Sequence, residues 1–170
     1  MNEVRRVNLD ELEWSPWSLR AGIGVEAKDP ARLLGSELCG FRVERLAPGQ
    51  QASQLHRHHF QEELFLILRG AGTLRHGASE VPVRRGDFIL YRAGDEAPHT
   101  FVNTGTEPLE FVATGNRVAH EVCEYPEEGT VFVEAVGAEL PNASVDGSRE
   151  RVEAWYRAGQ AVKEPEDAGD

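Results

Sequence analysis

The sequence predicts an all-β fold, and three features of its pattern support this prediction. Many short segments are rich in Val, Ile, Leu and Phe. Stretches such as PGQ, RGAG, RRGD and NTGTEP separate these segments, and their residues are typical of turns. Few stretches show the period of 3.6 residues that an amphipathic helix requires. Short strands at near-regular spacing are typical of a β-sandwich or a β-barrel.

The expected strands follow one another from residue 40 onward. In the segment 63–68, Phe65 and Ile67 share one face, and Leu64, Leu66 and Leu68 share the other. Because both faces are apolar, we expect this strand to be buried on both sides. The full set of expected strands is 40–47, 63–68, 72–76, 79–85, 87–92, 99–103, 109–115 and 130–136.

The 170 residues are enough for one domain with a sizeable core. We expect residues 1–39 to form an N-terminal extension that packs on a β-domain of residues 40–136. The stretch DPARLLG in that extension predicts a short helical turn. Residues 137–170 are expected to form a C-terminal extension, with a short helix over 148–160 capped by Ser148 and a frayed tail.

The charge and the cysteine content limit which binding partners and which cellular compartment we expect. The chain has 29 acidic and 18 basic residues and a formal charge of −11, which argues against binding to nucleic acid or to an anionic membrane. No apolar run has the length of a spanning helix, and the N-terminus is a poor signal peptide. Cys39 and Cys123 do not form a disulfide framework, so we expect a reducing cytoplasm and two small buried hydrophobic side chains.

The stretch LHRHHFQEELF crowds imidazoles and carboxylates against an apolar strand. His56 and His58 are two positions apart and therefore share a face of an extended chain. The residues that follow must form a turn or a bulge, which brings Glu62 or Glu63 near them. A carboxylate beside a buried strand is costly unless it is paired or bound to a metal. Two imidazoles and a carboxylate are ligands that Zn, Mn, Fe, Ni or Cu accepts.

A fourth ligand has to come from elsewhere in the chain. His99 opens a strand after a loop with Gly and Pro, which places its side chain at a strand end. His59 has the wrong parity for His56 and His58 and is expected at the rim of the site. His76 in a turn is expected in solvent, and His120 has no partner at metal-ligand spacing.

At these residues the sequence resembles the cupin superfamily. Gly49, His56-Arg57-His58, Glu63 and Gly70 are similar to the first cupin motif, with a Gly-to-His gap that is one residue longer. The spacing from glutamate to glycine in that motif selects Glu63 over Glu62.

The second cupin motif is similar to Gly86, Gly94, His99 and Asn103. Arg92 stands where the family has proline, and the loop DEAP is two residues longer than in the pattern. Asn103 is expected to secure the strand that follows His99.

The resemblance implies a double-stranded β-helix, which is a jelly-roll cupin barrel, over residues 40–136. It also implies one divalent metal ion (Zn, Mn, Fe or Ni) bound by His56, His58, Glu63 and His99. Three histidines and one glutamate around a six-coordinate ion leave two positions for water or a small molecule. Elsewhere in the chain, the segment CEYPEEGTVF resembles small bacterial single-domain cupins, which are often described as similar to sugar-phosphate isomerases.

We expect the protein to act on a small polar metabolite, anionic or neutral, with isomerase-like or dioxygenase-like chemistry. The alternative is a cupin that binds a small molecule or sugar without turnover, while a storage role is disfavoured because storage cupins are usually longer and duplicated. The apolar face with Leu64, Leu66 and Leu68 predicts a homodimer, unless Trp14 and Trp17 cover it. Candidate catalytic residues are Tyr91, Glu62 and Gln61, and candidate substrate-binding residues are Arg92, Phe65 and Phe101.

Overall fold

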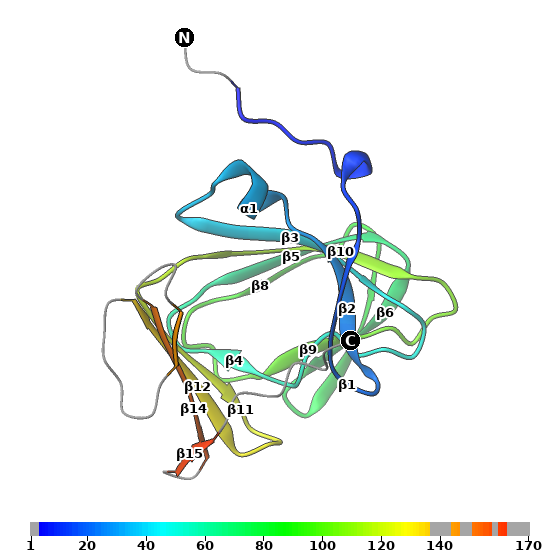
Figure 1. The fold of residues 1–170 in the computed structure, drawn as a ribbon. Coiled ribbons are helices and arrows are strands. Elements are labelled where there is room, and N and C mark those ends of the chain that lie inside the picture. The colour runs from blue at the N-terminus through cyan, green and yellow to red at the C-terminus, as the bar shows by residue number, and fades with distance from the viewer. Residues whose placement is uncertain (1–3, 137–143, 147–150, 158–159, 163–170) are drawn as a thin grey trace.

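The computed structural model describes residues 4–136 and the backbone of residues 144–146, 151–157 and 160–162. Its described part is almost entirely β, as predicted (Figure 1). The expected helical turn is confirmed as α1 (Pro30–Leu34). Asp29 caps its start by accepting the backbone N–H of Arg32, and Gly35 ends it with a left-handed φ of 66°.

Three sheets build the barrel. The first has the order β1-β2-β3-β10-β5-β8, with β1 (Ser15–Arg20), β2 (Ile23–Lys28), β3 (Cys39–Leu46), β10 (Leu109–Asn116), β5 (Glu63–Arg69) and β8 (Phe88–Tyr91). The second has the order β13-β14-β12-β11-β4, with β13 (Ser144–Asp146), β14 (Arg151–Arg157), β12 (Thr130–Val136), β11 (His120–Tyr125) and β4 (Arg57–His58), and β15 (Gln160–Val162) pairs with β14. The third has the order β7-β6-β9, with β7 (Ser79–Arg84), β6 (Ala71–His76) and β9 (His99–Val102).

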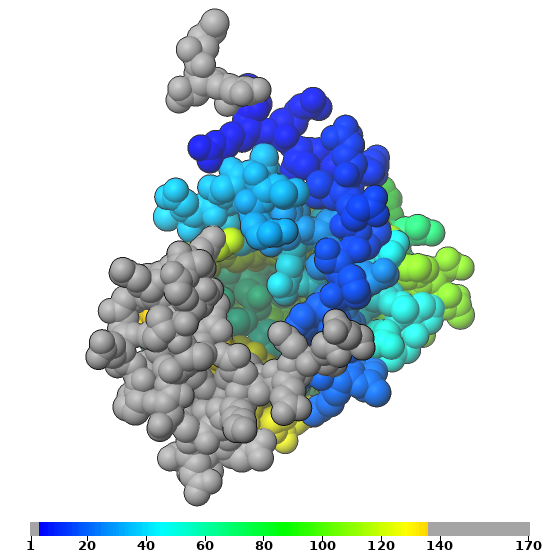
Figure 2. Space-filling model, viewed as in Figure 1, coloured from blue at the N-terminus to red at the C-terminus, as the bar shows by residue number. Residues whose placement is uncertain are grey.

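The apolar core lies between these sheets and leaves one part of the barrel interior to polar residues. Phe65 and Ile67 of β5 point inward and pack with Phe101 and Phe111. The Phe65 ring also contacts His99 edge-on, with 5.7 Å between ring centroids. The core therefore supports the histidines directly. Figure 2 shows that one face of the molecule is hollowed, with green atoms of the barrel strands deep beside the blue N-terminal segment.

Each strand expected from the sequence lies within one residue of an observed strand at both ends. β1, β2 and β11 were not anticipated. The expectation that β5 is buried on both sides was wrong for this single chain. Phe65 and Ile67 are buried, but Leu64, Leu66 and Leu68 on the outer face are only half-buried.

The expected C-terminal helix over 148–160 was also wrong. Residues Arg151–Arg157 form β14, which pairs antiparallel with β12 over its whole length and also contacts β13 and β15. Val162, the first residue of the expected frayed tail, ends β15, and the Ser148 cap and the other tail residues, 163–170, lie outside the described residues. Pairing with distant elements overrides the local helix signal here because helix propensity is a weak preference that tertiary context outweighs.

The described N-terminal residues extend the first sheet. β2 pairs with β3, and β1 pairs with β2 at the far end from β5 and β8. Lys28 and Arg45 lie over the Trp14 ring, at 4.6 and 4.2 Å from its centroid. In the described part of the chain, no helix combines the length and the apolarity needed to cross a membrane.

Candidate metal centre

His56 and His99 face each other across an isolated antiparallel bridge. The His56 N–H donates to the His99 carbonyl at 3.2 Å, and the His99 N–H donates to the His56 carbonyl at 2.7 Å. Their imidazole rings lie 4.8 Å apart between centroids. His58 follows on β4, and its ring lies 5.1 Å from that of His56. The expected shared face of His56 and His58 therefore agrees with the positions of their rings.

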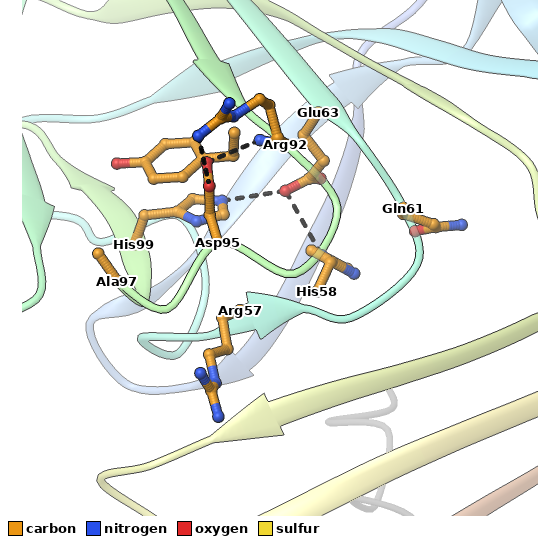
Figure 3. Close-up of a pocket in the computed structure, with 9 residues that line it drawn as sticks. Arg57, His58, Gln61, Glu63, Arg92, Asp95, Ala97 and His99 are labelled. Carbon is orange, nitrogen blue, oxygen red and sulfur yellow. Dashed lines mark hydrogen bonds and ion pairs between the residues drawn. The ribbon is translucent and has the colours of Figure 1, made fainter.

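Glu63 at the start of β5 brings a carboxylate to the same point. Its Oε2 lies 3.0 Å from Nε2 of His99 and 3.4 Å from Nε2 of His58 (Figure 3). One ligand atom each from His56, Glu63 and His99 lie within 4.8 Å of one another. The structure thus brings together all four residues that the motif spacing selects.

The hydrogen bonds of His56 leave one ring nitrogen available as a ligand. Its Nδ1 lies 2.8 Å from the Gln54 carbonyl oxygen, which can only accept, so Nδ1 carries the proton. Nε2 therefore keeps its lone pair. Burial, followed by the neighbouring His99, lowers the pKa of His56 to about 3, which keeps the ring neutral at physiological pH. A neutral histidine held from behind by a carbonyl is a typical metal ligand.

Nearby opposite charges shift the pKa values of two further predicted ligands, Glu63 and His58. Burial alone would raise the pKa of Glu63, but the hydrogen bond from His99 and the nearby His58 and His56 lower it to about 2. Burial lowers the pKa of His58, but contacts with Glu121 and Glu63 outweigh it and raise the pKa overall. The centre therefore holds an ionised carboxylate among imidazoles, which is the form that binds a divalent cation.

β11 adds three inward-facing residues to the wall of the centre, and the sequence reasoning missed them. Glu121 is 3% exposed, and its Oε1 accepts the backbone N–H groups of His59 at 2.9 Å and Phe60 at 3.3 Å. The same oxygen lies 3.7 Å from Nδ1 of His58. Cys123 is buried close to His56 and His58, and the Tyr125 ring stacks 5.8 Å from that of His56. The sequence signal for these residues was their spacing of two in HEVCEY, which puts them on one face of a strand.

A pocket opens beside three of the four predicted ligands, His58, Glu63 and His99. Arg92 reaches its edge but is mostly exposed, and it lies 3.5 Å from Asp95. Arg57 at the opposite side is paired with Glu124. The cavity is lined by Arg57, His58, Gln61, Glu63, Tyr91, Arg92, Asp95, Ala97 and His99.

The candidate catalytic residues differ in their positions. Tyr91 is buried, stacks on His99 with 3.7 Å between ring centroids, and lies 3.0 Å from Nδ1 of His76 through its hydroxyl oxygen. Burial raises the pKa of its hydroxyl, so Tyr91 supports His99 rather than carrying a free base. Gln61 lines the cavity, whereas Glu62 is exposed and does not line it.

Two candidate substrate-binding residues lie in the core instead of the cavity lining. Phe65 and Phe101 are 6% and 2% exposed and pack against each other beneath the histidines. Asn103 is fully buried, and its amide donates to the carbonyls of Leu46 and Glu107. It thereby secures the end of β9, as expected.

The remaining histidines and cysteines mostly follow expectation. His76 and His120 are exposed, and His59 lies at the rim, 3.5 Å from Glu124. Cys123 is buried as expected, and burial raises the pKa of its thiol to about 12. The expectation was wrong for Cys39, which is exposed because it opens β3 at the end of the sheet.

Comparison with known proteins identifies the fold family. Residues 42–115 match the model of the cupin domain family. The chain therefore has the cupin fold, and its residues 42–115 are similar to the cupin domain family. The match runs from within β3 to within β10 and includes the four predicted ligands, so the cupin motifs coincide with the candidate metal centre.

The chain is similar to three known proteins, of which one is a curated sequence and two are crystal structures. It is 35% identical over 73 residues to an oxalate-binding protein of Thermotoga maritima, an alignment that covers 43% of this chain and 58% of that protein. The chain thus spans 58% of the length of the curated relatives it matches.

Two crystal structures extend the comparison. A sugar phosphate isomerase of Silicibacter pomeroyi has a TM-score of 0.76 at 24% identity, covers 96% of this chain and 99% of its own, and shows the shared fold. A predicted oxalate decarboxylase of Thermotoga maritima has a TM-score of 0.57 at 26% identity and covers 66% of this chain and 99% of its own.

Proposed function

We propose that this cupin holds one divalent metal ion at His56, His58, Glu63 and His99 and acts there on a small anionic metabolite. The convergence of His58 and His99 on Oε2 of Glu63 carries the proposal, together with the free Nε2 of His56. Such an ion supplies Lewis-acid chemistry, because it holds and polarises a carboxylate or carbonyl oxygen. The chain itself orients the ligand atoms and shields one side of the centre.

The cavity favours a small ligand. The enclosed part of this pocket is small, with about 10 Å³ open to the centre of a water-sized sphere, and the rest is open to solvent. Arg57 and Arg92 at its edges provide positive charge in a chain of net charge −11. The similarity to an oxalate-binding protein supports the same class of ligand.

A second candidate function is binding of the same anion without turnover. Among the residues that line the cavity, Arg57 and Arg92 are paired with Glu124 and Asp95, and the other ionisable groups are predicted ligands or the buried Tyr91. None is a free general base, which proton transfer in an isomerase would require. This observation favours binding, or chemistry driven by the metal alone, over isomerisation.

Metal removal tests the centre. Protein stripped with a chelator and reloaded with Zn, Mn, Fe(II) or Ni is expected to take up one ion per chain, with a higher melting temperature. His58→Ala is expected to lose most of the metal, whereas His120→Ala, which changes an exposed histidine, keeps it. Elemental analysis and thermal unfolding measure both effects. Equal metal content in the two variants would contradict the proposal.

The ligand class is tested by calorimetry on metal-loaded and stripped protein. Oxalate and short keto acids are expected to bind only the loaded form, and sugar phosphates more weakly. Arg92→Ala is expected to weaken anion binding and leave the metal content unchanged, and Arg85→Ala provides a control at an exposed arginine outside the cavity. Consumption of the anion by loaded protein supports an enzyme, and intact anion after long incubation supports a binding protein.

A further inference from the structure

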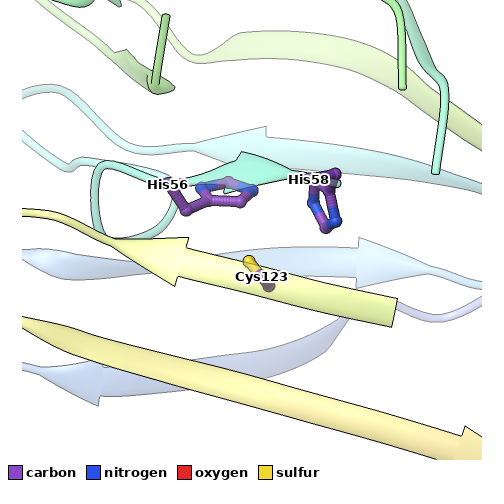
Figure 4. Close-up of side chains that lie close together, drawn as sticks. All are labelled: His56, His58 and Cys123. Atoms are coloured by element: carbon purple, nitrogen blue, oxygen red, sulfur yellow. The ribbon is translucent and has the colours of Figure 1, made fainter. Parts of the chain in front are cut away.

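Cys123 lies on the wall of the candidate metal centre, outside the main cluster of apolar core residues. It is 2% exposed and is absent from the core cluster formed by residues such as Phe65 and Ile67. β11 pairs antiparallel with β4, and Cys123 lies directly opposite His58 in that register. Figure 4 shows its sulfur on the side of the His56 and His58 rings. The strand register thus places the buried thiol beside two imidazoles.

The ligand atoms fall into two overlapping groups. One atom each from His56, His58 and Cys123 lie within 4.8 Å of one another, and the same holds for His56, Glu63 and His99. His56 belongs to both groups, whereas the rings of His58 and His99 are 6.5 Å apart between centroids. Two atoms bound to one ion at about 2.0–2.3 Å lie at most about 4.6 Å apart. Small side-chain movements therefore bring either group onto one ion.

We propose that the Cys123 thiolate is a further ligand of the metal ion, bound from the β11 side. The inference rests on the proposed metal centre and adds a sulfur donor to its imidazoles and carboxylate. As the bond from Sγ to the ion forms, the S–H bond breaks and its proton leaves to water. Neither Cys123 nor His56 lines the cavity, so sulfur leaves the cavity side of the ion open to an anion.

A sulfur ligand changes which metals the centre prefers. Thiolate is a soft donor that favours Zn, Co, Ni and Cu over Mn. Loss of the thiol is therefore expected to weaken Zn binding more than Mn binding. If only imidazoles and the carboxylate bind the ion, loss of the thiol is expected to change the binding of Zn and of Mn to the same extent.

Cobalt substitution tests the proposal on the full chain. Chelator-stripped protein is loaded with Co(II), cobalt content is measured by elemental analysis, and the near-ultraviolet band of thiolate-to-cobalt charge transfer is recorded. The variant Cys39→Ser is expected to keep the band at full strength, and in it Cys123 is the one remaining thiol. Cys123→Ser is expected to lose the band while it still binds cobalt through the histidines and Glu63.

The outcomes separate this inference from the metal centre itself. Bound cobalt without the band in Cys39→Ser would overturn the role of Cys123 and leave the histidine and glutamate site standing. Absence of cobalt from the wild-type protein would overturn both. Because Cys39→Ser retains the native Cys123, it decides the question even when Cys123→Ser does not fold.

Discussion

Glu121 is placed to hold His58 in the orientation that a metal ligand needs. Its buried carboxylate is fixed by backbone N–H groups and lies 3.7 Å from Nδ1 of His58, which leaves Nε2 of that ring directed at Glu63. Carboxylates behind metal-bound histidines contribute roughly 10- to 100-fold to metal affinity.

We expect Glu121→Gln to weaken metal binding by about 10- to 100-fold, because the amide gives His58 a neutral partner. Competition with a chelating dye measures the affinity. Glu127→Gln is the matched control, since Glu127 is exposed and pairs with Arg75 away from the centre. If both variants bind metal as the wild type does, Glu121 is a structural residue only.

At this scale, sequence reasoning selected the four residues that the structure brings together, but it did not select the groups that support them. Parity and motif spacing depend on residues close in sequence, and this was sufficient for His56, His58 and Glu63. Glu121 and Cys123 reach the centre through the pairing of β11 with β4, which joins residues more than 60 positions apart. The segment HEVCEY was not recognised as a strand, so its inward row of polar groups was not assigned.

At the scale of elements, Gly70 shows why the motif glycine has to stand between β5 and β6. Its φ is 78°, and a Cβ atom there would lie 2.4 Å from the Pro108 carbonyl oxygen. Gly86 also has a positive φ, of 94°, but nothing lies within 4 Å of its Cβ position. A substitution at Gly86 would therefore cause backbone strain alone, whereas one at Gly70 would cause backbone strain and steric overlap.

We expect Gly70→Ala to destabilise the fold by more than about 1 kcal/mol, because strain and overlap act together. Gly86→Ala bears only the strain and is expected to cost less. Urea unfolding of both variants, compared with the wild type, measures the difference. Equal losses would show that the strands shift to relieve the contact with Pro108.

The strands were predictable because glycine, proline and asparagine in the local sequence mark the turns between them. The C-terminal segment was not, because SRERVEAWYRAGQ carries a helix cap and charged residues that suit a local helix. Its backbone instead completes the sheet beside β12. Whether this segment forms a helix or a strand depends on an available sheet edge elsewhere in the fold, which no local sequence pattern indicates.

At the scale of the whole molecule, one apolar surface lacks a cover in the described chain. Leu64 and Leu66 on the outer face of β5 lie opposite Leu90 and Phe88 of β8, which are 50% and 69% exposed. Among the described strands, β8 is the last of its sheet, and no described strand pairs with its outer edge. Trp17 on β1 lies at the opposite edge, so it does not cover this surface.

A second copy of the chain is the occupant that this surface favours. Its four apolar residues carry no charge, so two copies meet there without the repulsion expected between chains of net charge −11. A two-fold axis beside β8 would also give each free strand edge a partner. We therefore propose a homodimer formed through the outer face and edge of β8.

Phe88→Glu combined with Leu90→Glu is expected to convert the dimer into a monomer of about half the mass, because it places like charges in contact across the two-fold axis. Sedimentation velocity at micromolar concentration measures the mass, and circular dichroism shows whether the variant remains folded. Trp17→Glu is the control, since it changes a residue that is 46% exposed at the other end of the sheet. A monomeric wild-type protein would contradict the dimer. Dissociation by Trp17→Glu, with the double variant still dimeric, would show that the dimer forms through another surface.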